Sequence, residues 1–522
     1  MKSERPGPLR WLRHLLDELL VRLLSLRLFH YEINDPGLEL QPVPKFVPIP
    51  RVKGLPIVGT FLDLIAAGGA MHLHKYIDAR HRQYGPIFRE RLGGTQDAVF
   101  VSSANLMRGV FLHEGQYPQH PLPDAWTLYN QRHACRRGLF FMEGAEWLHN
   151  RRILNRLLLN GNLNWMDVHI ENCTKRLVDQ WRSRTAELET TVNVTEPTLD
   201  ESCEKRSYEV PQLEQQLYRW SIEVLCCIMF GNTVITCPEI QSALDHFTQI
   251  VHKVFEHSSR LMTFPPRLAQ MLRLGIWSDF EKNVDEVLRE GAAIIDHCIE
   301  LQQHQGPKDD PQLPHEEALF QRLQAAEVAA DMIKRIFVDL VIAAGDTTAF
   351  SSQWALFVLS QNQFLQKRLA RERASHGSQL LHGLIKESLR LYPVAPFIGR
   401  YLPQDTQLGG HFIEKDTLVL LSLYTAGRDA SHFERPELVL PERWCLGQSE
   451  QVHQSHGSLP FAIGQRSCIG RRVALKQLHS LLGQCATQFE MHCLNEQPVD
   501  CVLRMVTVPD QTLRLALRPR TE

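Results

Sequence analysis

The sequence has 522 residues, of which 43% are hydrophobic and 22% charged, an ordinary globular composition with enough chain for a large core. A net charge of −2 and a pI near 6.9 exclude the basic character typical of nucleic-acid-binding proteins. Twelve cysteines occur without CxxC or zinc-ligand spacing, which excludes a disulfide scaffold and indicates free thiols in a reducing interior.

Residues 1–41 are predicted to form a basic amphipathic N-terminal segment. Leucines recur at helical spacing among interleaved charges, and no run approaches the roughly 18–20 apolar residues that a membrane span needs. This pattern suits a mitochondrial presequence or a helix on a membrane surface. Asp17 and Glu18 are atypical of a presequence, and an ordinary amphipathic helix is the alternative.

Residues 42–59 contain five prolines and are predicted to form an extended connector. Residues 60–522 are predicted to form one large domain, mainly α with small β-sheets. Helical patterns dominate residues 140–400, with polar surface loops expected at 183–212 and 302–315. Strands are expected near 86–102, 395–422 and 500–517.

A long apolar helix is predicted around VDLVIAAGDTTAFSSQWALFVLS (338–360), interrupted by the polar stretch from Gly345 to Thr348. Buried polar groups need partners, and the Thr347 hydroxyl can bond back to the preceding turn and loosen the helix. A locally satisfied kink would explain this pattern without any chemistry. Downstream, Glu387 and Arg390 in ESLR lie one turn apart and can pair, although this motif alone is common on surface helices.

The stretch FAIGQRSCIGRR places Cys468 between Gly464 and Gly470, just before a predicted helix. Helix-start amides and Arg466 favour a thiolate there, which suits either a nucleophile or a metal ligand. A nucleophile would need a base, and the nearby histidines form no recognisable signature with it. A thiolate ligand of haem iron is consistent with glycines that allow close approach and an arginine for a propionate.

With PERW (441–444) between ESLR and the cysteine loop, residues 45–520 resemble the cytochrome P450 family. The resemblance implies that family's fold, bound haem b, and Cys468 as the axial ligand of the iron. It implies a buried network of Glu387, Arg390 and Arg443. It further implies that haem is bound by Trp147, Arg151, Arg400, Phe461, Arg466 and Cys468.

By the same resemblance, Thr347 and Asp346 assist O2 activation and proton delivery. Two departures from the family pattern are visible: Ala344 replaces a usual glycine, and the chain before ESLR is shorter than in most members.

The double arginine Arg471–Arg472, with Lys386 before ESLR, resembles the mitochondrial members of the family. This implies electrons from NADPH through a reductase and a [2Fe–2S] ferredoxin that docks on a basic face. A solvated helix face is the alternative. The expected location is the matrix side of the inner mitochondrial membrane, with peripheral membrane contact.

The substrate pocket is expected to be apolar and lined by residues 112–140, 341–344, 394–398 and 505–507, which favours a lipophilic substrate. Over its whole length the chain is similar to insect ecdysteroid 2-hydroxylases of the family, which implies conversion of 2-deoxyecdysone to ecdysone. The alternatives are another sterol or lipophilic substrate, a non-catalytic haem protein that binds a ligand, and an enzyme that isomerises a peroxide without external electrons.

Overall fold

The computed structural model describes residues 46–56, 58–93, 97–192, 207–262, 264–304, 318–372, 378–445 and 452–520. The predicted N-terminal segment 1–41 and most of the predicted loop 302–315 lie outside these residues. The described part of the proline-rich connector is non-helical, as predicted.

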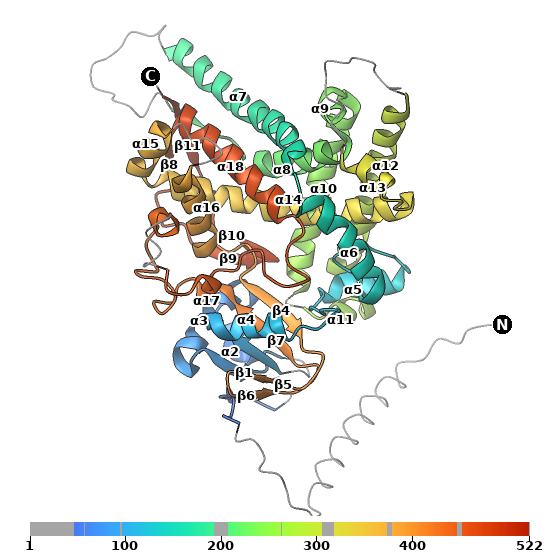
Figure 1. Cartoon of the computed structure of the whole chain (residues 1–522), viewed down its shortest axis with the longest axis vertical. Coiled ribbons are helices and arrows are strands. Elements are labelled where there is room, and N and C mark those ends of the chain that lie inside the picture. The colour runs from blue at the N-terminus through green and yellow to red at the C-terminus, as the bar shows by residue number, and fades with distance from the viewer. Residues whose placement is uncertain are drawn as a thin grey trace, which may run out of the picture. The chain divides into compact units, whose positions relative to one another are not determined.

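Helices make up most of the described chain (Figure 1). The long ones are α7 (Asp167–Val192), α8 (Leu213–Phe230), α10 (Pro238–Leu261), α12 (Gly275–His304), α14 (Ala330–Ser360) and α18 (Arg471–Gln488). The shorter ones are α2 (Phe61–Ala66), α3 (Leu73–Tyr84), α4 (Ala104–Leu112), α5 (Asp124–Arg132), α6 (Gly144–Leu158), α9 (Thr233–Thr236), α11 (Pro266–Met271), α13 (Leu319–Ala325), α15 (Gln363–Arg371), α16 (Gln379–Leu391) and α17 (Leu423–Ala426). Single 3-10 turns are η1 (Ala70–His72), η2 (Asn164–Met166), η4 (Pro441–Trp444) and η6 (Ser455–Gly457).

The strands form small sheets, and those predicted from the sequence are confirmed. One sheet has the order β1 (Ile87–Glu90), β2 (Ala98–Val101), β7 (Leu418–Ser422) and β4 (Phe397–Tyr401), with β2 and β7 parallel. A second joins β3 (Tyr208–Glu209), β11 (Leu515–Pro519) and β8 (Phe489–Cys493). Two hairpins pair β5 (Thr406–Leu408) with β6 (His411–Ile413), and β9 (Cys501–Arg504) with β10 (Val506–Pro509).

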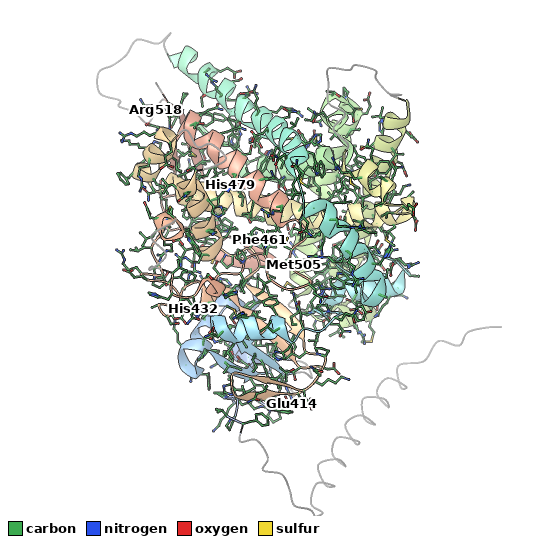
Figure 2. The ribbon with its side chains drawn as sticks, in the orientation of Figure 1. Glu414, His432, Phe461, His479, Met505 and Arg518 are labelled. Carbon is green, nitrogen blue, oxygen red and sulfur yellow. The ribbon has the colours of Figure 1, made fainter. Side chains whose placement is uncertain are left out.

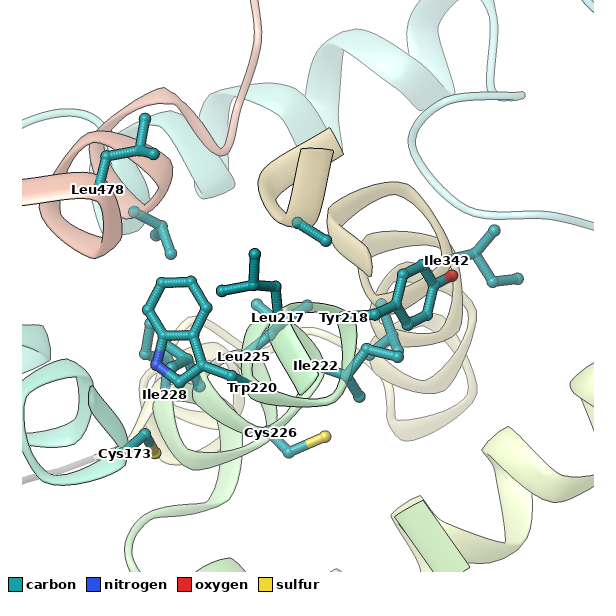
Figure 3. Packing of buried hydrophobic residues seen from close by; sticks show 14 of the residues in the cluster. Cys173, Leu217, Tyr218, Trp220, Ile222, Leu225, Cys226, Ile228, Ile342 and Leu478 are labelled. Carbon is teal, nitrogen blue, oxygen red and sulfur yellow. The ribbon is translucent and has the colours of Figure 1, made fainter. Parts of the chain in front are cut away.

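Helix α14 lies at the centre of the largest hydrophobic cluster and packs against α8, α16 and α18 (Figure 1). Figure 3 shows part of this packing, where α8 contributes residues such as Leu217, Trp220 and Leu225. Two residues of α14, Ala343 and Thr347, are exposed, whereas Ile342, Asp346 and Thr348 beside them are buried. The two exposed residues are one turn apart, so they open the same face of the helix.

Two sequence predictions need correction. Helix α7 continues to Val192, into the segment predicted as a loop from residue 183, and β3 forms near that segment's end. The strand β8 directly follows α18 and was not predicted, because its pairing with β11 is a long-range contact. The long helix predicted over 338–360 is confirmed, since α14 continues through Gly345–Thr348. Within the described ranges, no helix is long and apolar enough to cross a membrane.

Candidate active site

The cysteine loop is a closed turn immediately before α18. The Cys468 amide donates to the Phe461 carbonyl at 2.9 Å, and the Ser467 amide donates to the Gly464 carbonyl at 3.3 Å. Gly464 has a φ of 82°, in the left-handed region that favours glycine. Figure 2 labels Phe461 near the middle of the view. The loop therefore presents its cysteine at a helix start, as the sequence predicted.

A buried glutamate missed by the sequence reading, Glu114, holds this loop in place. Its Oε1 accepts from the Gln465 amide at 2.8 Å, and its Oε2 accepts from Arg400 Nε at 2.7 Å. A Cβ at Gly464 would lie 2.1 Å from Glu114 Oε1, so the close approach itself requires glycine. Glu114 belongs to no motif, and only the tertiary contact reveals its position.

The Cys468 side chain is accessible to water although protein atoms surround it. Desolvation raises the pKa of the thiol, whereas the Gly470 and Arg471 amides and the Arg151 and Arg471 charges lower it. These amides belong to the start of α18, where the helix dipole favours negative charge. An accessible thiol among fixed positive groups can bind a metal ion as the thiolate.

Arg151, Arg400 and Arg466 form an arginine cluster beside this loop. Arg151 Nη2 donates to the Ser467 carbonyl at 2.6 Å, and Arg466 donates to the Phe140 and Met142 carbonyls. Burial, together with the charges of Arg400 and Arg151, lowers the pKa of Arg466 to about 10. Burial likewise lowers the pKa of Arg151 to about 10. Arg151 and Arg466 therefore stay positive at neutral pH.

Each of these arginines keeps one buried nitrogen without a hydrogen-bond partner among the described residues: Arg151 Nε, Arg400 Nη2 and Arg466 Nε. Buried donors normally have partners, so three orphaned donors in one cluster indicate a site for an anionic ligand. The Trp147 ring completes the cluster, with Arg466 Cζ 4.7 Å from its centroid. The structure therefore brings together the residues predicted to bind propionates.

His120 also belongs to this cluster and was not predicted. Arg466 Nη1 donates to His120 Nδ1 at 2.6 Å. Burial, then the charges of Arg466 and Arg400, lower the pKa of His120 to about 3. The imidazole is therefore neutral and accepts a hydrogen bond from Arg466.

Helix α14 supplies the polar groups of a second face. Thr347 Oγ1 donates to the Ala343 carbonyl at 2.7 Å, which confirms the predicted back-bond, and Ser221 Oγ donates to the Ala344 carbonyl at 3.0 Å. Asp346 is buried, and desolvation raises the pKa of its carboxyl to about 8. Near neutral pH this group can therefore hold or release a proton.

The Glu387–Arg390 pair is fully buried, with both guanidinium contacts at 2.8 Å. Arg443 Nε lies 3.3 Å from Glu387 Oε1, so the expected three-residue network is present. Glu387 also accepts from the Leu440 amide at 2.9 Å and from Trp444 Nε1 at 2.8 Å. This network joins α16 to η4, ahead of the cysteine loop.

The family model described as Cytochrome P450 matches residues 49–516 of this chain. The chain belongs to the cytochrome P450 family. It is 79% identical over 100% of its length, and 99% of the relative's, to "Cytochrome P450 315a1, mitochondrial" of Drosophila melanogaster. It is 27% identical to the mitochondrial 1,25-dihydroxyvitamin D(3) 24-hydroxylase of Rattus norvegicus, covering 90% and 89% of the two chains. It is 24% identical to the mitochondrial cholesterol side-chain cleavage enzyme of Oncorhynchus mykiss, covering 86% of each.

As a cytochrome P450, the chain is a monooxygenase that uses haem and O2. The site fits the haem: an accessible thiol lies at a helix start, and three orphaned arginine donors suit two carboxylates. When bound, the haem iron supplies the activation of O2 for insertion of one oxygen atom into a C–H bond.

The expected substrate-lining segments lie on separate elements that the fold joins. The Thr507 amide donates to the Val394 carbonyl at 2.8 Å, so residues 394 and 507 are neighbours. A crevice of about 380 Å³ near α5 is lined in part by the expected 112–140 segment, including Leu122 and Arg137, and its lining mixes apolar and polar side chains.

The three basic residues predicted to meet the electron donor differ in their surroundings. Arg472 is exposed and Arg471 half-buried at the start of α18. Lys386 is half-buried, with its Nζ 4.9 Å from the centroid of the Trp444 ring, and burial lowers its pKa. Lys386 therefore contacts the protein's own tryptophan, which the sequence did not predict.

Proposed function

We propose that this cytochrome P450 is a mitochondrial steroid hydroxylase, and specifically that it converts 2-deoxyecdysone to ecdysone. The observation that carries the proposal is the 79% identity over the full chain to a mitochondrial cytochrome P450 of Drosophila melanogaster. The names of more distant relatives add vitamin D and cholesterol substrates. The choice of carbon 2 rests on the likeness of the whole chain to insect ecdysteroid 2-hydroxylases.

In this proposal Cys468 holds the haem iron from the loop before α18. The arginine cluster and Trp147 hold the propionates, and Phe461 lines the same loop. The exposed face of α14 at Ala343 and Thr347 borders the position of O2 and substrate. Thr347 orients the reacting oxygen, and Asp346 delivers protons to it, for which a pKa near 8 is well matched.

Electrons come from NADPH through a ferredoxin reductase and a [2Fe–2S] ferredoxin. The basic residues Arg471 and Arg472 begin the helix that follows the cysteine loop, and no ion pair joins them to any residue the structure describes. An acidic ferredoxin would be attracted to this face. Lys386 contributes less, since its charge already lies over Trp444.

The enzyme is proposed to rest peripherally on the matrix side of the inner mitochondrial membrane. Two groups of exposed apolar side chains support this contact. The first lies at and around α2, and the second at and around α11. They comprise Leu55, Val58, Phe61, Leu62, Ile65 and Met71, and Met262, Leu268, Met271 and Leu272.

The test is a reconstituted assay with purified ferredoxin and reductase, a panel of ecdysteroid precursors, and mass spectrometry of the products. Ecdysone formed from 2-deoxyecdysone, and lost on Cys468→His, is the expected result. Preferred hydroxylation of another precursor in the panel would refute 2-deoxyecdysone as the substrate. Haem binding without any product would favour a ligand-binding protein, and turnover without reductant would favour a peroxide isomerase.

A further inference from the structure

Tyr218 occupies the contact between α8 and α14 beside the proposed proton donor. It is 1% exposed, and no described residue forms a hydrogen bond of standard geometry with its hydroxyl. A Cβ at Gly345 would lie 2.8 Å from that hydroxyl oxygen, so the missing side chain of Gly345 makes room for the tyrosine. In Figure 3 the ring extends from α8 toward the turn of α14 that carries Ile342.

Asp346 lies on the next turn of α14 and is 2% exposed. Its Oδ1 is likewise without a standard hydrogen bond in the described chain. The Tyr218 hydroxyl packs against Gly345, the residue directly before Asp346, which places it beside this carboxyl. In agreement with this position, Tyr218 lowers the pKa of Asp346 against the effect of desolvation. Burial of two polar oxygens without standard hydrogen bonds costs free energy, so their position in one contact indicates a functional role.

The outer end of this contact reaches the surface. Glu214 lies one turn before Tyr218 on α8, and His252 of α10 lies across from both. The His252 and Tyr218 ring centroids are 6.2 Å apart, and His252 Nδ1 is 3.8 Å from Glu214 Oε1. The side chains of His252 and Glu214 are 51% and 38% exposed. The series therefore runs from solvent to a fully buried carboxyl.

We propose that Tyr218, with Glu214 and His252 at the surface, forms the route by which solvent protons resupply Asp346. A hydroxyl can donate one proton while it accepts another. As Tyr218 gives its proton to the Asp346 carboxylate, it takes one that enters from solvent past Glu214 and His252. One proton then enters from solvent for each proton that Asp346 delivers, and the route returns to its starting charge.

Tyr218 can act in two ways, by supplying protons to Asp346 or by changing the pKa of Asp346, and these two effects can be measured separately. The titratable groups that influence this carboxyl are Tyr218 and Glu214, the latter raising its pKa. Tyr218→Phe removes a group that stabilises the carboxylate, so the pKa should rise above about 8. At pH 6.5 Asp346 is therefore protonated at rest in both proteins, and only resupply during turnover can differ.

The test measures peroxide released per steroid hydroxylated at pH 6.5 for the holoenzyme, Tyr218→Phe, Glu214→Gln and His252→Gln. Tyr392→Phe is the matched control, because Tyr392 is a half-buried tyrosine whose ring stacks on Trp354 of α14, with 4.2 Å between the ring centroids. We expect a several-fold rise in Tyr218→Phe, a smaller rise in each surface variant, and none in the control. Unchanged peroxide release in Tyr218→Phe would overturn the proposal, and a rise confined to Tyr218→Phe would overturn the surface entry.

A second measurement is independent of turnover. The infrared band of the protonated Asp346 carboxyl, identified by its loss in Asp346→Asn, should shift in Tyr218→Phe and not in Tyr392→Phe. No shift would show that the hydroxyl does not contact the carboxyl, and would overturn the proposal. The proposal rests on monooxygenase activity, and a failed ecdysteroid assay would leave this infrared result standing.

Discussion

The protein contains two buried groups of arginines that differ in how their charges are satisfied. In the first, Glu387, Arg390 and Arg443 form a network in which Glu387 accepts both contacts from Arg390. The remaining Arg390 nitrogen, Nη1, donates to the Gly427 and Pro436 carbonyls. In the second, the arginine cluster, Arg400 is paired with the Glu114 carboxylate, and each of the three guanidinium groups retains an orphaned nitrogen.

Both groups are conformationally fixed, so burial of charge alone does not distinguish scaffold from binding site. The surroundings of the nitrogens without a standard hydrogen bond do distinguish them. In the first group that nitrogen is Arg443 Nε, which lies 3.3 Å from Glu387 Oε1 within an ion pair. The arginine cluster carries more positive charge than its own carboxylates offset, which favours binding of an anion. The arginine cluster, which lies beside the cysteine loop, is the group with three donor nitrogens that lack partners among the described residues.

The largest effect is expected at the network of Glu387, Arg390 and Arg443. Glu387→Ala leaves two buried arginines without their carboxylate and should cost about 3–5 kcal/mol of unfolding free energy. Urea unfolding followed by circular dichroism measures this loss. Glu434→Ala, in a half-exposed pair with Arg435, is the control and should change stability by less than about 0.5 kcal/mol. Equal losses of unfolding free energy in Glu387→Ala and Glu434→Ala would contradict the distinction between the two groups of arginines.

Arg466→Gln, in the arginine cluster, should affect haem retention more than it affects the free energy of unfolding. Removing one of several mutually repelling charges should cost little unfolding free energy, while haem is lost more easily. One charge-assisted hydrogen bond is worth about 1.5–3 kcal/mol, or roughly 10–100-fold in haem dissociation. Transfer of haem to apomyoglobin measures that rate. Arg443→Gln is the matched change in the Glu387 network, and a similar fall in stability for both arginines would refute the comparison.

The arginine cluster should also make stability sensitive to acid through His120. The pKa of His120 is about 3 in the folded chain, against about 6.5 when unfolded. The folded state therefore binds fewer protons between these values. The stability that neutral His120 contributes is complete above pH 6.5 and is lost as the pH falls toward 3. His120→Gln should reduce the slope of unfolding free energy by up to about 1.4 kcal/mol per pH unit, measured by urea unfolding from pH 7 to 5. If the dependence of unfolding free energy on pH were unchanged in His120→Gln, groups other than His120 would cause the sensitivity to acid.

The smallest effect on stability is expected at the exposed start of α18. The double change Arg471→Glu/Arg472→Glu should alter unfolding free energy by less than about 0.5 kcal/mol. Reduction by ferredoxin should nevertheless slow, and its dependence on salt should weaken. Stopped-flow reduction over a salt series tests this. Rates equal to those of the unchanged enzyme would exclude these arginines from the docking face.

Several parts of the site could be predicted because they are local patterns. The cysteine loop needs glycine at a left-handed position and a helix directly after it, and both are legible in FAIGQRSCIGRR. The ESLR pair depends only on one helical turn. Glu114, His120 and Tyr218 could not be predicted, since each acquires its role from a partner that is distant in sequence.

By itself, the sequence determined the family, the main strands and the helix that carries Asp346 and Thr347, and it predicts Cys468 as the iron ligand. Short-range geometry and an ordered set of motifs are sufficient for these. Only the tertiary structure decided which buried charges are satisfied, that Lys386 lies over Trp444, and that Tyr218 packs against Gly345 of the helix that carries Asp346. Those outcomes depend on packing between distant elements and on the electrostatic cost of burial, which no local pattern encodes.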